Sequence, residues 1–595
     1  MRLLAPALLL LAAVSQAQEP NDWHWTDVPR VVAVGDVHGA YPALVGLLQA
    51  TGLIDEKLQW TGGTTHLVSL GDLIDRGPES RRVMDLLMAL QSEAPQHGGQ
   101  VHVVLGNHEL MNLMGDLRYV TAADFAAFAA DETPAMRDRA YTSYAAEQTG
   151  DVDETALRAQ FDATYAAGYF ARAEAFSPTG RYGSWLLSRP AIIVVNGTAY
   201  LHGGLPEIVA QSNVAALNAR IHDEIERYLQ LRKQLEDAGV LPVDMMQHDH
   251  ETASSALETA TGDTATWLKE FIALSDAQDL GIDGPFWYRG SVYCRPIVER
   301  PKLEAALDAL DAKRAVVGHT PSDDRRVQGL YGGELIMLDT GMLASYYSGM
   351  PAALVEEPTG DYVQYLGADK HGEIELGGRH EAYARTREAL IDALETGAAN
   401  VLEKPDAAPW KIAVDAGGSM LEAVFYPSRG DAAPDYELAA AALDGALETA
   451  IVPPTVARTL DGTPGALQLR YPDGMTETER LNRKLGFPGW CPIQPQVSLM
   501  QTFDVLTANR GRSFDNIVYH DDLSQLMLID FSKAFGTERQ LPASFDPATL
   551  SLPEALVTTL RSLDESKLQT LFGGRLRKAQ IRALLVRRDA LLEGR

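Results

Sequence analysis

The stretch HLVSLGDLIDRG, residues 66–77, constrains the fold of this chain more than any other. An apolar, strand-like run ends abruptly before Asp72, and Asp75 and Arg76 follow within four residues. Two carboxylates and a guanidinium therefore converge at the end of a predicted strand. Carboxylates are common metal ligands and a guanidinium can hold phosphate oxygens, so the stretch predicts a site for both.

Two similar stretches flank it in the sequence. VVAVGDVHG (residues 31–39) precedes it and VHVVLGNHE (residues 101–109) follows, and each is an apolar run that ends in glycine and potential metal ligands. Between them, residues 41–54 and 80–91 have apolar side chains at the spacing near 3.6 that is typical of a helix. The alternation predicts consecutive βαβ units, in which ligands bind beyond the carboxyl ends of the strands.

Four potential ligands fall at those strand ends: Asp36, His38, Asp72 and Asn107. A single strand that ends in Asp means little, because Asp often caps the helix that follows. Three strands in succession with ligand-type residues at the same position make capping alone a poor explanation.

Two histidines further along the chain occupy similar positions. Residues 189–206 contain two apolar runs around an Asn-Gly turn, which predicts a hairpin that delivers His202 at a strand end. AVVGHTP (residues 315–321) runs into His319 in the same way, and residues 335–355 predict two more strands around a tyrosine-bearing loop. A lone strand-end histidine is usually structural, but six oxygen and nitrogen ligands together suit two cations.

The remaining parts of this half are less informative. Residues 115–184 are alanine-rich and charged and predict an inserted helical cap, and residues 209–279 predict further helices. GPFWYRGSVYC (residues 284–294) places Arg289 beside two aromatic residues, where an ordinary surface arginine is the simplest interpretation.

Five motifs carry a family resemblance. GDVHG, GDLIDRG, GNHE, HGGL and GHT occur in this order and resemble the signature blocks of the phosphoprotein phosphatase family of calcineurin-like metallophosphoesterases, over residues 29–366. The resemblance implies an α/β fold, an αββα metallophosphatase sandwich, with two metal ions. It assigns one metal to Asp36, His38 and Asp72. It assigns the other to Asp72, Asn107, His202 and His319, so that Asp72 would bridge the two.

The chain departs from the eukaryotic serine/threonine enzymes of that family in two places. Leu105 replaces the arginine before GNHE, and LDTGMLASYYSG replaces the late SAPNYC-type block. Together with HELMN and the WYRG block, these departures are closer to the bacterial-type Shewanella-like phosphatases. Serine/threonine specificity therefore does not carry over.

The expected chemistry is phosphoester hydrolysis. Two metals about 3.5 to 4 Å apart can share a hydroxide, lower its pKa and clamp a phosphoryl group for in-line attack. His108 would be the general acid that protonates the leaving oxygen, oriented by Asp75. Arg76 and Arg289 would hold phosphate oxygens.

The second half resembles a different family. Residues 380–403 predict a helix, and the following KPDAAPW suggests a linker, so residues 367–409 are expected to form a helical linker. Residues 410–595 resemble the atypical kinase fold shared by lipid-kinase-like and HipA-like proteins and predict a smaller α+β domain. Glu437 would be its helix glutamate, and Asn516 and Asp530 its metal-binding pair.

Two residues that the kinase resemblance calls for are missing. Tyr426 stands where the strand lysine belongs, and Gly511 stands where the catalytic-loop aspartate belongs. Without the lysine the nucleotide phosphates lose their cation, and without the aspartate no base accepts the hydroxyl proton. The second half is therefore predicted to be a pseudokinase or a binding module.

The N-terminus, the charge and the cysteines bear on location. Residues 3–14 form an apolar run too short for a bilayer core, which needs about 20 apolar residues, so residues 1–17 predict a cleaved secretory signal with no integral membrane segment afterwards. The protein would be secreted, or periplasmic in a Gram-negative bacterium. The net charge of −30 argues against nucleic acid as a partner. The only cysteines, Cys294 and Cys491, are expected in different domains and imply no disulfide framework.

The sequence thus predicts a secreted dinuclear-metal phosphatase that acts on phosphorylated protein, at phosphotyrosine or phosphoserine, or on small phosphoesters. A dinucleoside polyphosphate hydrolase and a non-catalytic nucleotide- or partner-binding protein are the alternatives. The ligand set accepts Mn, Fe or Zn, as divalent or trivalent ions, without choosing among them. The oligomeric state stays open.

Overall fold

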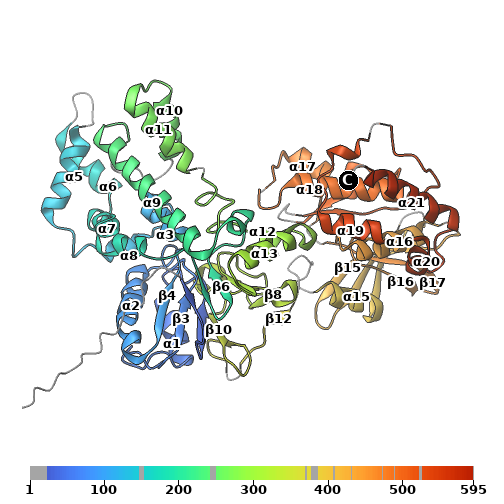
Figure 1. Ribbon diagram of the computed structural model, residues 1–595, viewed down its shortest axis with the longest axis horizontal. Coiled ribbons are helices and arrows are strands. Elements are labelled where there is room, and N and C mark those ends of the chain that lie inside the picture. The colour runs from blue at the N-terminus through green and yellow to red at the C-terminus, as the bar shows by residue number, and fades with distance from the viewer. Residues whose placement is uncertain are drawn as a thin grey trace, which may run out of the picture.

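The computed structural model describes residues 23–146, 153–241, 249–275, 277–368, 371–376, 386–406, 409–430, 432–471, 474–487, 489–520, 525–543 and 545–593. The predicted signal peptide lies outside these ranges. Two sheets with their helices account for the chain up to about residue 376, and a smaller α+β part follows from residue 386 (Figure 1). Among the described residues, every helix is too short or too polar to cross a lipid bilayer.

The first sheet carries the strands that precede the GD and GN motifs. Its strands in spatial order are β11 (Tyr362–Tyr365), β10 (Ala352–Glu356), β2 (Val31–Val34), β3 (His66–Ser69) and β4 (Gln100–Val103). The last three are parallel and are connected by α1 (Tyr41–Ala50) and α2 (Ser80–Glu93), which confirms the predicted βαβ units. Strands β2 and β3 are buried along their whole length, as expected for a parallel sheet covered on both faces.

The second sheet contains the predicted hairpin. Its strands in spatial order are β1 (His24–Trp25), β5 (Ile192–Val195), β6 (Thr198–Leu201), β7 (Arg314–Val317), β9 (Leu335–Met337), β8 (Gln328–Leu330) and β12 (Glu375–Leu376). β5 and β6 are antiparallel, and the turn residues Asn196 and Gly197 both have positive φ, at 52° and 76°. These values suit the tight turn that Asn-Gly favours, so the hairpin is confirmed.

The two sheets pack face to face, and helices cover their outer faces. Ala33 and Val68 of the first sheet share one buried cluster with Val195 and Val316 of the second. A separate cluster joins the outer face of the first sheet to Leu44 of α1 and neighbouring helices. This arrangement is the predicted αββα sandwich.

Further helices form the upper part of the molecule in Figure 1 and the junction with the second half. They are α3 (Asn107–Met114), α4 (Ala122–Ala126), α5 (Pro134–Ala146), α6 (Glu154–Thr164), α7 (Tyr169–Phe176), α8 (Arg181–Leu187), η2 (Glu207–Gln211), α9 (Val214–Asp237), α10 (Asp249–Leu257), α11 (Gly262–Ser275), α12 (Gly290–Tyr293), α13 (Pro296–Ala309) and α14 (Ala344–Tyr347). Small apolar cores hold them together, one around Phe161 and another around Phe271. Helices thus occupy the segments for which the sequence predicts them.

The second half is built on an antiparallel sheet with helices. Its elements are α15 (Arg387–Thr396), β13 (Ala399–Glu403), β14 (Trp410–Asp415), β15 (Met420–Pro427), α16 (Ala433–Leu447), β16 (Thr455–Leu460), β17 (Thr463–Leu469), β18 (Met475–Thr476), α17 (Glu477–Arg483), α18 (Ile493–Thr507), β19 (Ile517–Tyr519), β20 (Leu526–Leu528), α19 (Glu554–Ser562), α20 (Glu565–Phe572) and α21 (Lys578–Leu592). The larger sheet has the order β13-β14-β15-β17-β16, and β18, β19 and β20 form a second, small sheet. The additional α+β part is therefore present.

The prediction of a single helix through Glu403 is wrong. The helix α15 ends before Gly397, and β13 pairs with β14 as the edge strand of the larger sheet. Leu390 and Leu394 of α15 are fully buried in the same cluster as Trp410. Residues 387–403 thus belong to the fold of the second half because packing against the sheet, which local sequence does not reveal, decides their structure.

The expectation that the two cysteines imply no disulfide is wrong. Cys294 and Cys491 form a disulfide with a Cα–Cα distance of 5.4 Å, across a sequence separation of 197 residues. Cys294 directly follows α12 and Cys491 lies two residues before α18. Separation along the chain did not predict separation in space, and the disulfide joins the first half of the molecule to the second.

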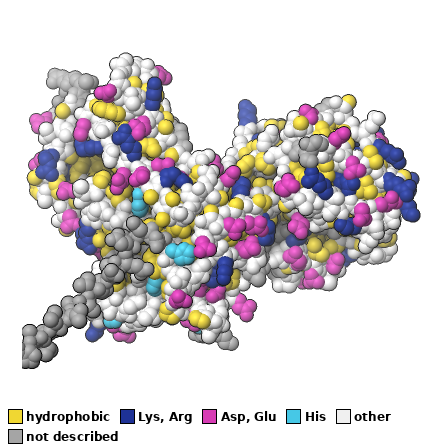
Figure 2. Space-filling view, viewed as in Figure 1, with side chains coloured by type: hydrophobic (Ala, Val, Ile, Leu, Met, Phe, Trp, Pro, Cys, Tyr) yellow, Lys and Arg dark blue, Asp and Glu magenta, His cyan; other side chains and the backbone are white. Residues whose placement is uncertain are grey.

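Acidic side chains gather on one visible part of the surface. In Figure 2, Asp and Glu side chains cluster near the middle of the molecule, below a deep notch between the upper helices and the second half. This distribution accords with the net charge of −30.

Candidate metal centre

The structure brings all six predicted ligands into one buried cluster. The ligands lie beyond the carboxyl ends of strands from both sheets, and every one is at most 6% exposed: Asp36 after β2, His38 after β2, Asp72 after β3, Asn107 at the start of α3, His202 after β6 and His319 after β7. The sandwich thus aligns strand ends from two sheets and brings the residues of the strand-end pattern together.

Two groups of possible ligand atoms lie side by side in this cluster. The ligand atoms of His38, Asp72 and His108 lie within 4.8 Å of one another, and so do those of Asp72, His202 and His319. Asp72 belongs to both groups. This shared position is what the predicted bridge between two cations requires.

The other two predicted ligands lie beside these groups. Asp36 Oδ2 is 3.9 Å from Nε2 of His38, and Asn107 Oδ1 is 2.8 Å from Nε2 of His202. Asp36 also accepts a hydrogen bond of 2.9 Å from the backbone N–H of His319. The two carboxylates, the amide and the imidazoles therefore face a common space.

Two glycines allow the central loops to touch at Asp72. Gly71 has φ of +90°, and a Cβ added there would lie 2.4 Å from the backbone nitrogen of Gly106. A Cβ added at Gly106 would lie 2.3 Å from Oδ1 of Asp72. The glycines of the GD and GN motifs are thus needed because the two backbones approach each other too closely for any side chain.

Glu109 supports this contact, and the sequence interpretation missed its role. Its Oε2 accepts hydrogen bonds from the backbone N–H groups of Asp72 and Gly106, at 2.7 and 2.8 Å, and its Oε1 accepts one from Leu73 at 2.8 Å. Burial and the nearby charge of Asp72 raise the pKa of Glu109 to about 7. The spacing from Gly106 to Glu109 is that of a helix capping box, which was the available signal.

Several site residues adopt left-handed backbone conformations. Positive φ angles between 47° and 69° occur at His38, Asp72, Asp75, Arg76 and His319. Such conformations cost non-glycine residues free energy and gather at functional sites, where surrounding contacts enforce them. Here the tight turns after each strand point the side chains into the shared space.

The buried carboxylates repel one another. Burial and the neighbouring Asp339 raise the pKa of Asp36 well above its ordinary value. Burial also opposes ionisation of Asp72, but the nearby positive charges of His202 and His108 hold its pKa well below the ordinary value. Bound cations would relieve this repulsion, because a nearby positive charge favours the ionised form of each carboxyl.

Asp339 is a site residue that the sequence interpretation passed over. It is 1% exposed, burial raises its pKa, and its Oδ2 has no hydrogen-bond partner among the described residues. It follows strand β9 by two residues. The pattern that identified Asp36 and Asp72, a ligand-type residue directly after an apolar strand, would have identified Asp339 as well.

The histidines turn their Nε2 atoms toward the centre. His38 Nδ1 lies 3.0 Å from the carbonyl oxygen of Ile74 and donates to it, which leaves Nε2 as the nitrogen with a lone pair. Burial lowers the pKa of His38 to about 3 and that of His319 well below its ordinary value, so both are neutral imidazoles able to bind metal. Within the described chain, Nε2 of His319 has no hydrogen-bond partner.

His202 differs in charge. Burial opposes its protonation, but the charges of Asp72 and Asp36 outweigh burial and raise its pKa to about 9. Its Nδ1 donates to the carbonyl oxygen of Leu70 at 2.8 Å, so Nε2 points at the ligand groups. A histidinium between two aspartates supplies the positive charge that a cation would otherwise bring. The residues present therefore fit two divalent cations in oxygen and nitrogen ligands.

His108 is the first residue in a series of hydrogen bonds that extends away from the ligand cluster. Its Nδ1 lies 2.7 Å from Oδ2 of Asp75, and Asn112 Nδ2 donates to the same Oδ2 at 2.9 Å. Buried Arg172 donates to Oδ1 of Asn112 at 2.7 Å. His108 Nε2 has no hydrogen-bond partner among the residues that the structure describes. The predicted pairing of His108 with Asp75 is thus present, whereas Asn112 and Arg172 were missed.

Arg76 lies at the edge of the ligand cluster, which we call the rim, and tyrosine side chains surround it. Its Nη1 is 2.7 Å from Nε2 of His38 and also donates to the hydroxyl of Tyr347. The guanidinium carbon lies 5.0 Å from the ring centroid of Tyr119 and 5.5 Å from that of Tyr346. Tyr346 is 59% exposed. A cation at the mouth of the site is therefore surrounded by aromatic rings.

Arg289 lies on the opposite side, next to His319. Its Nη1 donates to the carbonyl oxygen of His319 at 2.9 Å and to Oγ1 of Thr320 at 2.8 Å. Burial lowers its pKa. The sequence left open an ordinary surface arginine, but the structure places this guanidinium beside a predicted ligand.

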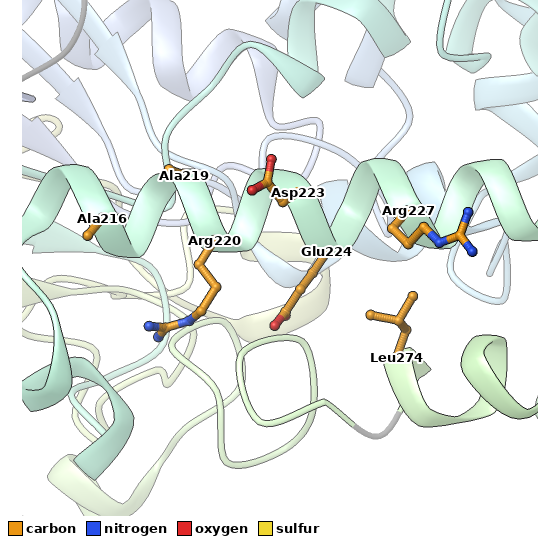
Figure 3. A pocket seen from close by; sticks show the side chains of 7 residues that line it. All are labelled: Ala216, Ala219, Arg220, Asp223, Glu224, Arg227 and Leu274. Atoms are coloured by element: carbon orange, nitrogen blue, oxygen red, sulfur yellow. The ribbon is translucent and has the colours of Figure 1, made fainter.

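A separate cavity of about 580 Å³ lies along α9 (Figure 3). Arg220, Glu224 and Arg227 line it, together with Leu274 of α11. None of the predicted site residues lines this cavity. Arg220 is paired with Asp279 and Arg227 with Glu270, so its cations are engaged within the chain.

Comparison with known proteins bears on the first half of the chain. A profile described as calcineurin-like phosphoesterase matches residues 29–323. Shewanella-like protein phosphatase 2 of Arabidopsis thaliana is 27% identical over 331 residues, which are 55% of this chain and 74% of the relative. Shewanella-like protein phosphatase 1 of Plasmodium berghei is 24% identical over 345 residues, 58% of this chain and 72% of the relative.

Among solved structures, a cold-active protein-tyrosine phosphatase of a psychrophilic Shewanella species is similar to 58% of this chain and 82% of its own length, at 23% identity. Its TM-score is 0.38, which is too low to support a conclusion about this chain.

Proposed function

We propose that the chain is a metal-dependent phosphatase of the calcineurin-like phosphoesterase family, whose profile matches residues 29–323, and that it hydrolyses phosphomonoesters on phosphorylated proteins. The observation that carries the proposal is Asp72, which belongs to both ligand groups in a cluster of buried, strand-end side chains. The names of the relatives support protein substrates, and the geometry supports the chemistry.

The ligand roles follow the family resemblance, which adds Asp36 and Asn107 to the two groups and leaves His108 for proton transfer. We assign one cation to Asp36, His38 and Asp72, and the second to Asp72, Asn107, His202 and His319. When bound, such cations lower the pKa of a water molecule and neutralise charge on the phosphoryl oxygens. The chain holds their ligands in place through Glu109 and the backbone turns at Gly71 and Gly106.

His108 is suited to protonate the leaving oxygen. Its Nε2 faces the centre without a partner among the described side chains, and its Nδ1 is held by Asp75. Asp75 keeps the ring oriented, so that Nε2 can give a proton to the departing alkoxide or phenoxide. Asn112 and Arg172 fix Asp75 in turn, so this proton donor is held on a rigid set of contacts.

The rim favours an aromatic leaving group. Arg76 and Arg289 are placed to hold phosphate oxygens from two sides, since each approaches a predicted ligand. The exposed ring of Tyr346 beside Arg76 offers a surface on which an aryl group could stack. Among phosphoproteins, phosphotyrosine is therefore the preferred substrate class, ahead of phosphoserine.

One panel of substrates tests the proposal. The purified mature chain, treated with a chelator and then supplied with Mn²⁺, is assayed on an aryl phosphate, phosphotyrosine and phosphoserine peptides, and a dinucleoside tetraphosphate. We expect hydrolysis of the monoesters that the chelator abolishes and the metal restores. Activity confined to the tetraphosphate would favour a dinucleoside polyphosphate hydrolase, and no activity with metal restored would favour a non-catalytic binding protein.

For the second half we propose a pseudokinase or binding role. Tyr426 lies in β15 at the position of the expected lysine, and Gly511 replaces the expected aspartate. Asn516 is engaged by its own chain, since its Oδ1 accepts from Ser513 N–H at 2.8 Å and its Nδ2 donates to Gly511 at 2.8 Å. The full chain with the Asp72→Asn substitution, incubated with radiolabelled ATP, should transfer no phosphoryl group. Transfer to itself or to a protein substrate would contradict the proposal.

We also propose that the protein is exported, with cleavage after Ala17. The Cys294–Cys491 disulfide supports this location, because structural disulfides persist in oxidising compartments. The intact mass of the protein recovered outside the cytoplasm should lack residues 1–17 and include the disulfide. A chain found in the cytoplasm with two free thiols and its full N-terminus would contradict the proposal.

A further inference from the structure

The second half of the chain reaches the rim of the metal centre at Trp490. The guanidinium carbon of Arg289 lies 5.0 Å from the ring centroid of Trp490, on the face of the indole. Arg289 in turn donates to the carbonyl oxygen of His319, a predicted metal ligand. One residue of the second half is therefore only one contact away from the metal centre.

Covalent and aromatic contacts hold Trp490 in this position. Its neighbour Cys491 forms the disulfide with Cys294, at the end of α12. The ring of Tyr293 stacks on Trp490, with centroids 6.1 Å apart and planes inclined by 20°. Trp490 thus contacts Arg289 and Tyr293, and its neighbour Cys491 is covalently bound to Cys294.

Hydrogen bonds also connect the segment from Arg289 to Arg295 with the second half of the chain. Gln525 Nε2 donates to the carbonyl oxygen of Tyr293 at 2.5 Å, and buried Arg295 donates to the carbonyl oxygen of Thr449 at 3.2 Å. In Figure 1, α12 and α13 lie at the junction between the sandwich and the second half. The segment from Arg289 to Arg295 is therefore held by both parts of the molecule.

These contacts leave Nε of Arg289 without a hydrogen-bond partner among the described residues. Nη1 is occupied by His319 and Thr320, and Trp490 covers a face of the guanidinium. Nε is buried and has no hydrogen-bond partner within the described residues. A planar guanidinium with one edge fixed and one face covered can offer its donors to phosphate in only a narrow range of orientations.

We propose that Trp490 is a positioning residue for phosphate binding, which acts by holding the guanidinium of Arg289 at the rim of the metal centre. The inference rests on the proposed function, because it assigns Arg289 to the phosphate of the substrate. The phosphatase site is then completed by the second half of the chain, and the disulfide Cys294–Cys491 keeps Trp490 in contact with Arg289.

The first test replaces the indole. In the full-length, metal-loaded protein, Trp490→Ala should raise KM for an aryl phosphate and Ki for inorganic phosphate by about three- to thirtyfold, the range of a partly desolvated cation–π contact. Trp490→Phe keeps an aromatic face and should retain most of the wild-type affinity. Phe514→Ala, which removes an exposed aromatic ring of the second half, is the matched control and should change neither constant.

A double-mutant cycle separates positioning from a merely structural role. If Trp490 acts through Arg289, the Arg289→Ala, Trp490→Ala double variant should bind inorganic phosphate no more weakly than Arg289→Ala alone. Additive losses would overturn the proposal, because Trp490 would then act independently of the guanidinium. The cycle uses folded variants of matched thermal stability, and Trp490→Leu, which also lacks an aromatic face, serves in place of Trp490→Ala if the latter is unstable.

The disulfide is tested in the same assay. The Cys294→Ser, Cys491→Ser double variant should raise Ki for inorganic phosphate in the wild-type background and should add nothing in the Trp490→Ala background. An unchanged Ki in the wild-type background would show that the disulfide does not hold Trp490 in place and would contradict that part of the proposal.

The outcomes distinguish this inference from the proposed function. If the wild-type protein hydrolyses phosphomonoesters and Trp490→Ala matches it in KM and Ki, the inference fails while the function stands. If the metal-loaded wild-type protein hydrolyses no phosphomonoester but binds inorganic phosphate more tightly than Trp490→Ala does, the function fails while the contact of Trp490 with Arg289 stands.

Discussion

The candidate metal centre and the region around Arg512 in the second half contain similar polar side chains, but the hydrogen bonding of these side chains differs. At the metal centre, buried polar atoms lack partners within the described chain, among them Nε2 of His108, Nε2 of His319 and Oδ2 of Asp339. In the second half, Arg512 donates to Asp504 at 2.9 Å and to the carbonyl oxygens of Asn516 and Ile529. Its polar groups are largely engaged with one another.

This difference in hydrogen bonding distinguishes a site that can bind a ligand from a region whose polar groups already bind one another. Unpaired buried polar atoms are costly, so a fold that retains several in one place indicates that something absent from the chain completes them. Beyond residue 386, the only such atom on a described side chain is Oε2 of Glu437. The first half thus shows the pattern expected of a site that binds a ligand, and the described part of the second half does not show it.

The largest expected effect comes from the shared ligand. Asp72→Asn should lower kcat/KM for an aryl phosphate at least about a thousandfold, or about 4 kcal/mol of transition-state stabilisation, because both ligand groups lose their common carboxylate. Metal content by elemental analysis should fall with it. Asp308→Asn, at an exposed position of α13, is the control. Near-wild-type, metal-dependent activity of Asp72→Asn would refute the bridging assignment.

The next effect concerns proton transfer. His108→Asn should lower kcat by about a hundredfold to ten-thousandfold on phosphoserine peptides, whose alkoxide leaving group needs a proton. The loss on an activated nitrophenyl phosphate should be smaller, because that leaving group departs without one. His97→Asn, on the exposed surface, serves as the control. Equal losses on both substrates would argue that His108 binds metal, as its place in the first ligand group allows.

A third prediction tests the second half through stability. Burial and the charge of Asp530 raise the pKa of Glu437 from 4.5 to about 8. The folded state therefore binds a proton that the unfolded state releases, and stability falls as pH rises from 4.5 to 8, by about 1.4 kcal/mol per pH unit, and then levels off. Glu437→Gln removes this dependence and can still accept from Phe531 N–H, as Oε1 now does at 2.6 Å.

The expected result for Glu437→Gln is a variant equal to wild type at pH 5 and more stable at pH 7, by about 3 kcal/mol at most. Denaturant unfolding at several pH values measures the difference, with Glu448→Gln at the exposed end of α16 as the control. A variant less stable than wild type at pH 7 would indicate that ionised Glu437 is used, as a nucleotide-binding site would need.

The smallest expected effect concerns selectivity at the rim. Tyr346→Ala should lower kcat/KM for a phosphotyrosine peptide about threefold and leave that for a phosphoserine peptide unchanged, because only the aryl group can stack on the exposed ring. Tyr346→Phe should retain the preference. A parallel loss on both peptides would show that Tyr346 acts on Arg76 rather than on the leaving group.

Much of the metal centre could be predicted because its ligands are marked locally. Asp36, Asp72 and His319 each follow a short apolar strand, and strand ends meet at one edge of an α/β sandwich whatever the length of the connections. The prediction of a helix through Glu403 was wrong because a distant segment, and not the local sequence, decides the structure there. Residues of β13 become a strand only because β14 lies beside them.

The sequence by itself determined the candidate ligands, the order of the motifs and the αββα sandwich, because periodicity and strand-end residues are properties of short segments. Only the tertiary structure decided which distant groups meet: Asp75 with His108, Cys294 with Cys491, and Trp490 with Arg289. The last two pairs join the halves of the chain. Their contacts depend on how whole layers and helices pack, and no local pattern in the sequence encodes that packing.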